Sequence, residues 1–208
     1  LFRTIYFDVT FFNTKIDDEI VPFEVFGDVF YRNAARTNRT GIEIGGSAEI
    51  FQGLQAKTSY TLSDFSYDSF SARVIGTDSL GNMVINDLSY DGNSVPSVPK
   101  HNLSLTVSYD KKFFETLTGF AKASYTNVSG MYVDDGNSEM SDGYSVFNSN
   151  IGMEWIVDRF QFVASCGVNN IFDKRYVAFV NINSAQKEFY EVGEPRNFFA
   201  GFNLGYTF

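Results

Sequence analysis

Residues that commonly carry catalysis or bind metals are scarce in this 208-residue sequence. It has one histidine, His101, and one cysteine, Cys166, so a disulfide, a cysteine-based zinc site or a histidine dyad would lack its second member. It has no GxSxG or P-loop motif, and paired carboxylates occur only in polar connecting segments. We therefore expect no enzyme, no catalytic residue, no resident metal and no cofactor.

Acidic residues form two clusters, one near residue 20 and one near residue 138. Carboxylate clusters suit hard cations such as those that bridge lipopolysaccharide, but the spacing matches no EF-hand loop, so solvated loops are the favoured interpretation. The members are Asp17, Asp18, Glu19, Glu24 and Asp28, and then Asp134, Asp135, Glu139 and Asp142.

Arginine and aromatic side chains in the polar connections could contact a ligand. The arginines could attract an anionic chelate, and the rings could stack on an aromatic or macrocyclic one. The candidates are Arg32, Arg36, Arg39, Tyr90, Tyr132, Phe179, Phe189 and Tyr190. Arg32 and Arg36 share the parity of an apolar strand face, so a position at lipid headgroup level is the favoured interpretation for these two. The net charge of −9, without a basic run, excludes nucleic acid as a partner.

The elements that position these residues are strands, because apolar and polar residues alternate with a period of two. Between Ile42 and Ile50 the apolar side chains fall on one face, and Glu, Gly and Ser fall on the other. The glycine and alanines at 119, 121 and 123 make the apolar face of one segment thin. The expected strands cover residues 2–15, 29–50, 53–66, 99–110, 115–130, 143–157, 160–175 and 195–208.

The connections alternate between short and long. Those near 51–52, 111–114 and 158–159 are tight, whereas 16–28, 67–98, 131–142 and 176–194 are long and polar. Short turns at one end and long loops at the other are typical of a transmembrane up-and-down antiparallel β-barrel, and a soluble sandwich gives no reason for the asymmetry. We therefore expect an all-β outer-membrane fold, with Cys166 facing lipid and His101 in a structural role.

Aromatic residues near the strand ends fit the two interfacial girdles of such a barrel. The expected girdle residues are Tyr6, Phe11, Phe12, Tyr109, Phe113, Phe114, Trp155, Phe160, Tyr206 and Phe208.

Eight strands could close as a small barrel or form part of a larger wall. A small barrel needs tightly interdigitated inward side chains, whereas the inward residues here are rich in Gly, Ser and Asn. Leu1 already lies within a strand, and open edge strands promote aggregation. We therefore expect a piece of a larger barrel, with partner strands upstream of Leu1.

Several motifs resemble those of TonB-dependent outer-membrane receptors. The segments 168–176 (VNNIFDKRY) and 193–198 (GEPRNF) are similar to the C-terminal signature of that family, and 16–24, 31–34, 39–43 and 98–103 resemble landmarks further upstream. The signature residues are Asn170, Phe172, Asp173, Tyr176, Gly193, Pro195 and Arg196. The final Tyr206 and Phe208 resemble the signal that the barrel assembly machinery recognises, and are equally compatible with a girdle role.

The resemblance implies that residues 1–208 are the C-terminal part of a barrel of about 22 strands, in the bacterial outer membrane, whose earlier strands and plug domain are absent from this chain. It implies active uptake of a scarce nutrient complex, a ferric siderophore by family frequency, energised by the TonB complex through the plug. Outer-membrane lipid and lipopolysaccharide would surround the wall. The alternatives are a passive porin, a small eight-stranded structural barrel and, in a different class, a barrel enzyme.

Overall fold

The computed structural model describes residues 4–25, 28–77, 79–184 and 190–208. This described part consists of strands, turns and loops, and holds no helix long and apolar enough to cross a membrane. The strands are β1 Thr4–Val25, β2 Asp28–Phe51, β3 Leu54–Thr77, β4 Met83–Ser89, β5 His101–Phe114, β6 Leu117–Val128, β7 Tyr144–Val157, β8 Phe160–Asn169, β9 Val177–Val180, β10 Tyr190–Val192 and β11 Asn197–Tyr206.

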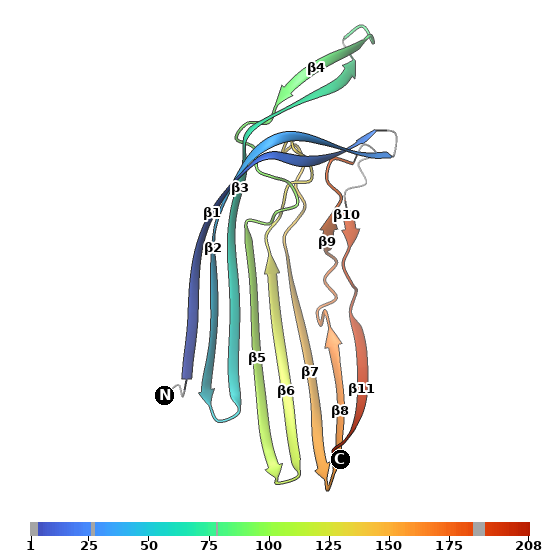
Figure 1. The fold of residues 1–208 in the computed structure, drawn as a ribbon. Coiled ribbons are helices and arrows are strands. Elements are labelled where there is room, and N and C mark those ends of the chain that lie inside the picture. Colours follow the sequence, from blue (N-terminus) through green and yellow to red (C-terminus); the bar gives the residue numbers. More distant parts are fainter. Residues whose placement is uncertain (1–3, 26–27, 78, 185–189) are drawn as a thin grey trace.

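The main sheet is an antiparallel up-and-down wall with the order β1-β2-β3-β5-β6-β7-β8-β11 (Figure 1). β4 extends it by pairing with the outer half of β3, and β9 pairs with β10 in a separate hairpin. β1 and β11 stand at opposite ends of the order, and in the described part no pairing joins them. The prediction of a partial wall is therefore confirmed, and the small closed barrel is wrong for this chain.

Strand register confirms the two chemically distinct faces. Residues paired directly across neighbouring strands share a face, so each face can be followed row by row. One row is apolar except at one serine: Ile5, Ala48, Ala56, Val107, Ala123, Ser149, Val168 and Phe198. The adjacent row is polar over six strands, at Thr4, Glu49, Gln55, Ser108, Lys122 and Asn150, and ends in Gly167 and Phe199. We call the first surface the lipid face and the second the inner face.

Phenylalanine rings cover glycines on the inner face. Phe12 lies over Gly41, Phe120 over Gly152 and Phe199 over Gly167, and in each pair the ring and the glycine face each other across two strands. A ring over a glycine restores the packing that the missing side chain gives up. The prediction that Phe12 belongs to a girdle is therefore wrong. Tyr6 is also wrongly placed there, because it pairs with Ser47 in a row of the inner face.

Two predicted loops are largely strand. Residues 16–25 extend β1 against β2, and residues 67–77 with Met83–Ser89 form a long arm that projects beyond the wall (Figure 1). Crossing a bilayer takes about 9–11 residues per strand, whereas β1 to β3 have 22 to 24. Hydrogen bonding between strands continues beyond the bilayer whatever the polarity of the side chains. The prediction from polar composition therefore ended these strands too early. The predicted strand 160–175 stops at Asn169 because Asn170 adopts a φ of 50°.

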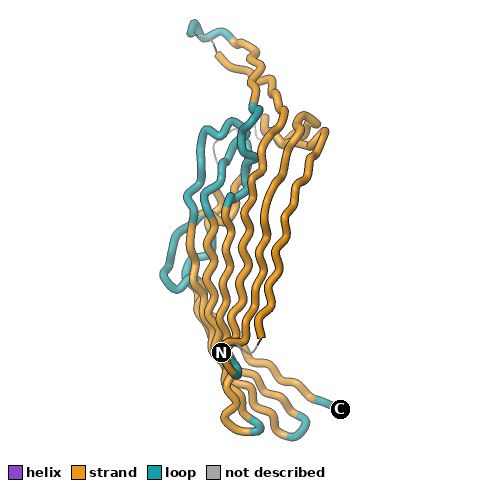
Figure 2. The backbone as a smooth tube through the Cα atoms, turned by 90° about the vertical axis from the view of Figure 1, so that its left-hand side faces the viewer, coloured by secondary structure: helices purple, strands orange, loops and turns teal. Residues whose placement is uncertain are grey.

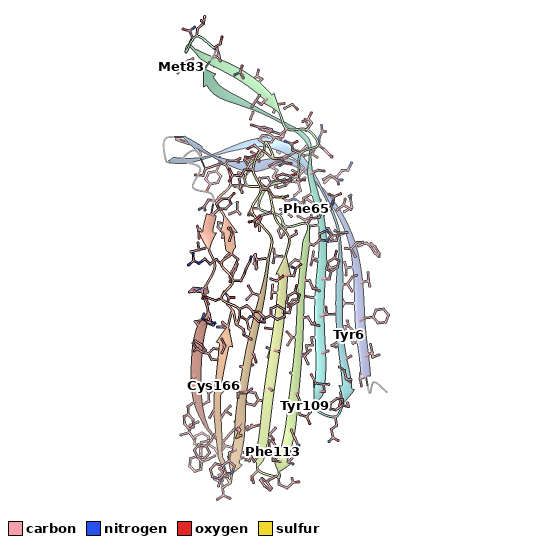
Figure 3. All side chains as sticks on the ribbon, turned by 180° about the vertical axis from the view of Figure 1, so that it is seen from behind. Tyr6, Phe65, Met83, Tyr109, Phe113 and Cys166 are labelled. Atoms are coloured by element: carbon pink, nitrogen blue, oxygen red, sulfur yellow. The ribbon has the colours of Figure 1, made fainter. Side chains whose placement is uncertain are left out.

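The two ends of the wall differ as expected. The turns at the lower end are tight, and the residues at two of them, Gly53 and Asp158, have positive φ of 85° and 54°. At the opposite end several long connections lie beside the sheet, whereas the arm of β3 and β4 projects beyond it (Figure 2). Figure 3 shows Phe113 near the turn end and Met83 at the tip of the projecting arm.

Candidate functional site at the loop end

Two small apolar cores hold the long connections together. The first contains Val21, Tyr67, Phe70 and Ala72, with Tyr90 and Val95 packed against it. The second contains Val128, Met131, Val133 and Val180, with Tyr144, Val177 and Ile182 packed against it. Phe70, Val133 and Val180 are at most 1% exposed. Most side chains on the two faces of the wall are exposed or only partly buried, so the loop end is the best-packed part of the described chain.

Asp135 is a polar hub that joins three separate segments. It is 4% exposed, and its carboxylate accepts hydrogen bonds from the Tyr67 hydroxyl at 2.5 Å and the Asn183 amide at 3.0 Å. Its backbone N–H donates to Asn183 Oδ1 at 3.0 Å, and its carbonyl accepts from Asn93 Nδ2 at 2.8 Å. Segments 67–93, 135 and 183 are thereby fixed to one another, and we call this set the Asp135 hub. Tyr67 shares the inner-face parity of Thr37, so the hub lies on the inner side of the wall.

The electrostatics of the hub favour a neutral Tyr67. Burial of the phenol and the adjacent Asp135 carboxylate raise the pKa of Tyr67 far above its ordinary value. The hydroxyl therefore remains a hydrogen-bond donor at any physiological pH. Because unpaired buried polar groups are costly, the hub stabilises one arrangement of the loops.

A second set of contacts joins the same segments. Ser94 and Asn137 exchange hydrogen bonds, from Ser94 N–H to Asn137 Oδ1 at 2.8 Å and from Asn137 Nδ2 to the Ser94 carbonyl at 2.9 Å. The Ser97 N–H donates to the Tyr132 carbonyl at 2.9 Å. Segments 90–98 and 131–142 are therefore bonded to each other.

Arg39 is held by a carboxylate that a bulge turns toward it. The register between β1 and β2 shifts between Ile16 and Glu19, and Asp18 there has a φ of 56°. The shift moves Glu19 onto the inner face, where it pairs with the Arg39 guanidinium and accepts from the Thr37 hydroxyl. Arg39 also lies 5.5 Å from the centre of the Phe65 ring. Its charge is thus balanced within the wall.

The β9–β10 hairpin contributes the most accessible candidate rings. Phe179 is 54% exposed and Tyr190 is 42% exposed. The Tyr190 hydroxyl donates to Glu139 Oε1 at 2.5 Å, and this bond raises the pKa of Tyr190 to about 12. The contact connects the hairpin to segment 131–142.

The remaining predicted ligand residues have different surroundings. Tyr90 packs on Phe70 with ring centres 5.2 Å apart, and Tyr132 forms an isolated bridge with Met140. Arg36 is exposed on the extended part of β2. Phe189 and the side chain of Arg32 lie outside the described part of the chain.

The acidic clusters are not arranged as a metal site within the described residues. There, no three His, Cys, Asp or Glu side chains converge on a point that could hold an ion. Glu19 and Asp135 instead accept hydrogen bonds from other residues of the chain. The sequence does not predict these roles, because both residues lie among similar polar residues.

The signature segment builds the corner before the last strand. The side-chain amide of Asn170 donates to the carbonyls of Lys174 at 2.8 Å and Glu194 at 3.0 Å, and its Oδ1 accepts from the Lys174 N–H at 2.9 Å. Asp173 accepts a hydrogen bond from the backbone N–H of Arg196 at 2.9 Å, so these two residues meet through the Arg196 backbone. Asn170 is the 2%-exposed centre of this corner.

The aromatic members of the signature pack around the same corner. The Tyr176 ring covers Gly193 and packs at a tilt against Tyr144, with ring centres 4.4 Å apart, and Phe172 meets Phe147 edge-on at 5.2 Å. At the other end of β11, Tyr206 lies 5.0 Å from the Phe160 ring and 5.2 Å from Phe208. These contacts are structural, and the assembly role of Tyr206 and Phe208 stays a prediction.

Comparison with known proteins decides the family. The family described as TonB dependent receptor-like, beta-barrel matches residues 1–171. The chain belongs to this family. TonB-dependent receptors are β-barrel proteins of the outer membrane, so the lipid face defined above contacts the outer membrane.

Curated proteins and solved structures that resemble the chain are transporters and receptors of the outer membrane or of ferric siderophores by their names. The ferrichrome outer membrane transporter/phage receptor of Escherichia coli strain K12 is 27% identical over 155 residues, which are 73% of this chain and 18% of that protein. The ferric yersiniabactin uptake receptor FyuA of Yersinia pestis has a TM-score of 0.68 at 19% identity, covering 99% of this chain and 28% of that one. The ferric preacinetobactin receptor BauA of Acinetobacter baumannii has a TM-score of 0.68 at 16% identity, covering 98% and 27%.

These structural likenesses show the fold alone, because the identities are low. The chain spans about a fifth of the length of the curated relative and slightly more than a quarter of each structure. It therefore corresponds to a section of barrel wall with its external loops.

Proposed function

We propose that this chain forms the C-terminal wall and external loops of a receptor that takes up a ferric siderophore with energy from the TonB complex. The observation that carries the proposal is the Asp135 hub, which joins three external segments on the inner side of the wall. Loops joined in this way can close over a bound ligand as one unit and separate it from the medium. A passive pore has no need for such closure.

The complete receptor would contain parts that this chain does not supply. In the proposal about 22 strands close the barrel, a plug fills it and the TonB complex acts through the plug. Lipopolysaccharide and lipid surround the wall, and the assembly machinery recognises the strand that ends at Tyr206 and Phe208. No step in this scheme is an enzymatic reaction.

The ligand class is inferred from the relatives together with the loop chemistry. The relatives named above carry ferrichrome, ferric yersiniabactin or ferric preacinetobactin according to their names. In this chain the exposed rings of Phe179 and Tyr190 offer stacking surfaces. Because Arg39 is balanced by Glu19, and Arg36 has the parity opposite to the inner-face Thr37, we assign the first ligand contact to these aromatic residues.

The test is uptake by cells that carry the full-length receptor as their only siderophore receptor. Cells limited for iron would be given radiolabelled iron on hydroxamate, catecholate and mixed-donor siderophores, with and without a functional TonB complex. We expect saturable uptake of at least one complex and its loss without TonB. Uptake that continues without TonB would support the porin alternative and contradict the proposal, as would failure of every siderophore while another nutrient is carried.

A matched pair of variants connects this activity to the loops. Asp135→Ala should reduce siderophore uptake, because the loop unit is no longer held together. Asp142→Ala removes an exposed carboxylate from the same loop and should leave uptake near the wild-type level. Equal uptake by the two variants would remove the hub from the mechanism.

A further inference from the structure

The lipid face has a depression near its turn end. It has a volume of about 600 Å³ and extends over four neighbouring strands, β5 to β8. Gly119 and Ala121 of β6 form its floor, and the larger Tyr109 of β5 and Met153 of β7 rise on either side. The thin apolar face noted in the sequence therefore becomes a groove between two ridges.

The groove lies in the leaflet nearest the short turns. Phe113, whose ring lies against Gly119, closes one end of it and lies at the end of β5, beside the tight turn to β6 (Figure 3). In outer-membrane barrels the short turns are periplasmic and the long loops are external. The hydrocarbon that covers this part of the wall therefore comes from the inner leaflet.

One cation stands at the rim. Lys111 pairs with Gly119 across the strands, lines the groove and has its ammonium 5.4 Å from the centre of the Phe113 ring. A lysine near the membrane surface extends its charged end toward the headgroups while its stem stays in apolar surroundings. The site thus combines an apolar channel with a positive charge at its headgroup end.

We propose that this groove binds one acyl chain of an anionic inner-leaflet phospholipid, with the lipid phosphate at Lys111. The apolar lining matches the chain, and the charge at the rim matches the phosphate. Continuity with the rest of the lipid face identifies the occupant as lipid, because the family places this face against the bilayer.

The experiment uses the full-length receptor, purified in mild detergent and titrated with phosphatidylglycerol while bound lipids are counted by native mass spectrometry. Ala121→Leu fills the floor of the groove. Ala56→Leu adds the same atoms to the same face two strands away and serves as the control. Lys111→Gln keeps the groove and removes the charge, and phosphatidylethanolamine and lipid A are the comparison lipids.

We expect one high-affinity phosphatidylglycerol on the wild type, retained by Ala56→Leu and weakened about tenfold by Ala121→Leu, since displacing two methylene groups from an apolar site has roughly that effect. Lys111→Gln should abolish the preference for phosphatidylglycerol over phosphatidylethanolamine. Unchanged binding by Ala121→Leu would overturn the groove, and a preference for lipid A would overturn the assigned lipid. The result is independent of siderophore uptake, so this proposal and the proposed function can fail separately.

Discussion

The Asp135 hub makes a quantitative prediction about loop opening. Asp135→Ala removes the acceptor of two side-chain hydrogen bonds, from Tyr67 and from Asn183, at a position that is 4% exposed. Bonds to a charged acceptor contribute about 1.5 to 3 kcal/mol each, so the variant should destabilise the closed loops by about 3 kcal/mol or more. This corresponds to a rise of roughly a hundredfold in the opening equilibrium. Asp135→Asn keeps an oxygen for Tyr67 but loses the charge, and should cost about 1 kcal/mol.

The measurement is hydrogen exchange of the full-length receptor, followed by mass spectrometry. In Asp135→Ala, exchange should accelerate together in segments 90–98, 131–142 and 181–184, because the hub and the Ser94–Asn137 bonds connect them. Segment 117–128 in the membrane wall is the internal reference and should be unchanged. Acceleration confined to 131–142 would refute the reasoning, since it would show that the loops open independently. An equally large effect of Asp135→Asn would refute the role of the charge.

Three further predictions concern packing, pH and the final corner. Gly152→Val should destabilise the barrel by about 1 to 3 kcal/mol through overpacking, whereas Gly201→Val, where an added Cβ would meet Ser165 Oγ at an ordinary contact distance of 3.6 Å, should be near neutral in urea unfolding; equal effects would contradict the ring–glycine packing. The Tyr190 bond to Glu139 should persist below pH 10 and be lost as pH rises through about 12, which spin-label distances between the two loops can follow; a loop distance that already changes at pH 8 would contradict this. Asn170→Ala removes three hydrogen bonds and a residue suited to a φ of 50°, and should cost about 2 to 4 kcal/mol in the same unfolding assay; a change below 1 kcal/mol would show that the corner is held by its aromatic contacts.

Periodicity predicted the wall well, because a strand with water on one side and hydrocarbon on the other must alternate. The faces of Ile42 and Lys122 follow from this single constraint, and the structure agrees with both. The tight connection predicted at 111–114 is wrong, because β5 continues to Phe114 and the turn lies at residues 115–116. The strand ends in the loops could not be predicted in the same way. Outside the bilayer both sides are aqueous, so β1 and the arm of β3 and β4 carry no alternation that marks where pairing stops.

The loop-end contacts had no signal in the sequence. Tyr67 and Asp135 are 68 residues apart, and each lies in a run of similar polar residues. The bulge at Asp18, which turns Glu19 toward Arg39, depends on one residue with positive φ that any Asp or Asn in the segment could have supplied. The signature corner could be located from the resemblance, but its centre at Asn170 became clear only from the hydrogen bonds.

The ring–glycine pairs have a consequence for how the barrel acquires its correct strand alignment during insertion. A register shift of one residue between paired strands turns every side chain of the shifted strand to the opposite face, from lipid to water or the reverse. A shift of two residues keeps each side chain on its own face, so the burial of apolar side chains does not disfavour it. Such a shift would place Phe12 opposite Arg39 or Glu43, and Phe120 opposite Asn150 or Glu154. None of these partners is a glycine, so each ring would meet a side chain. The ring–glycine pairs thus favour one strand register among the several that the hydrophobic pattern alone would allow.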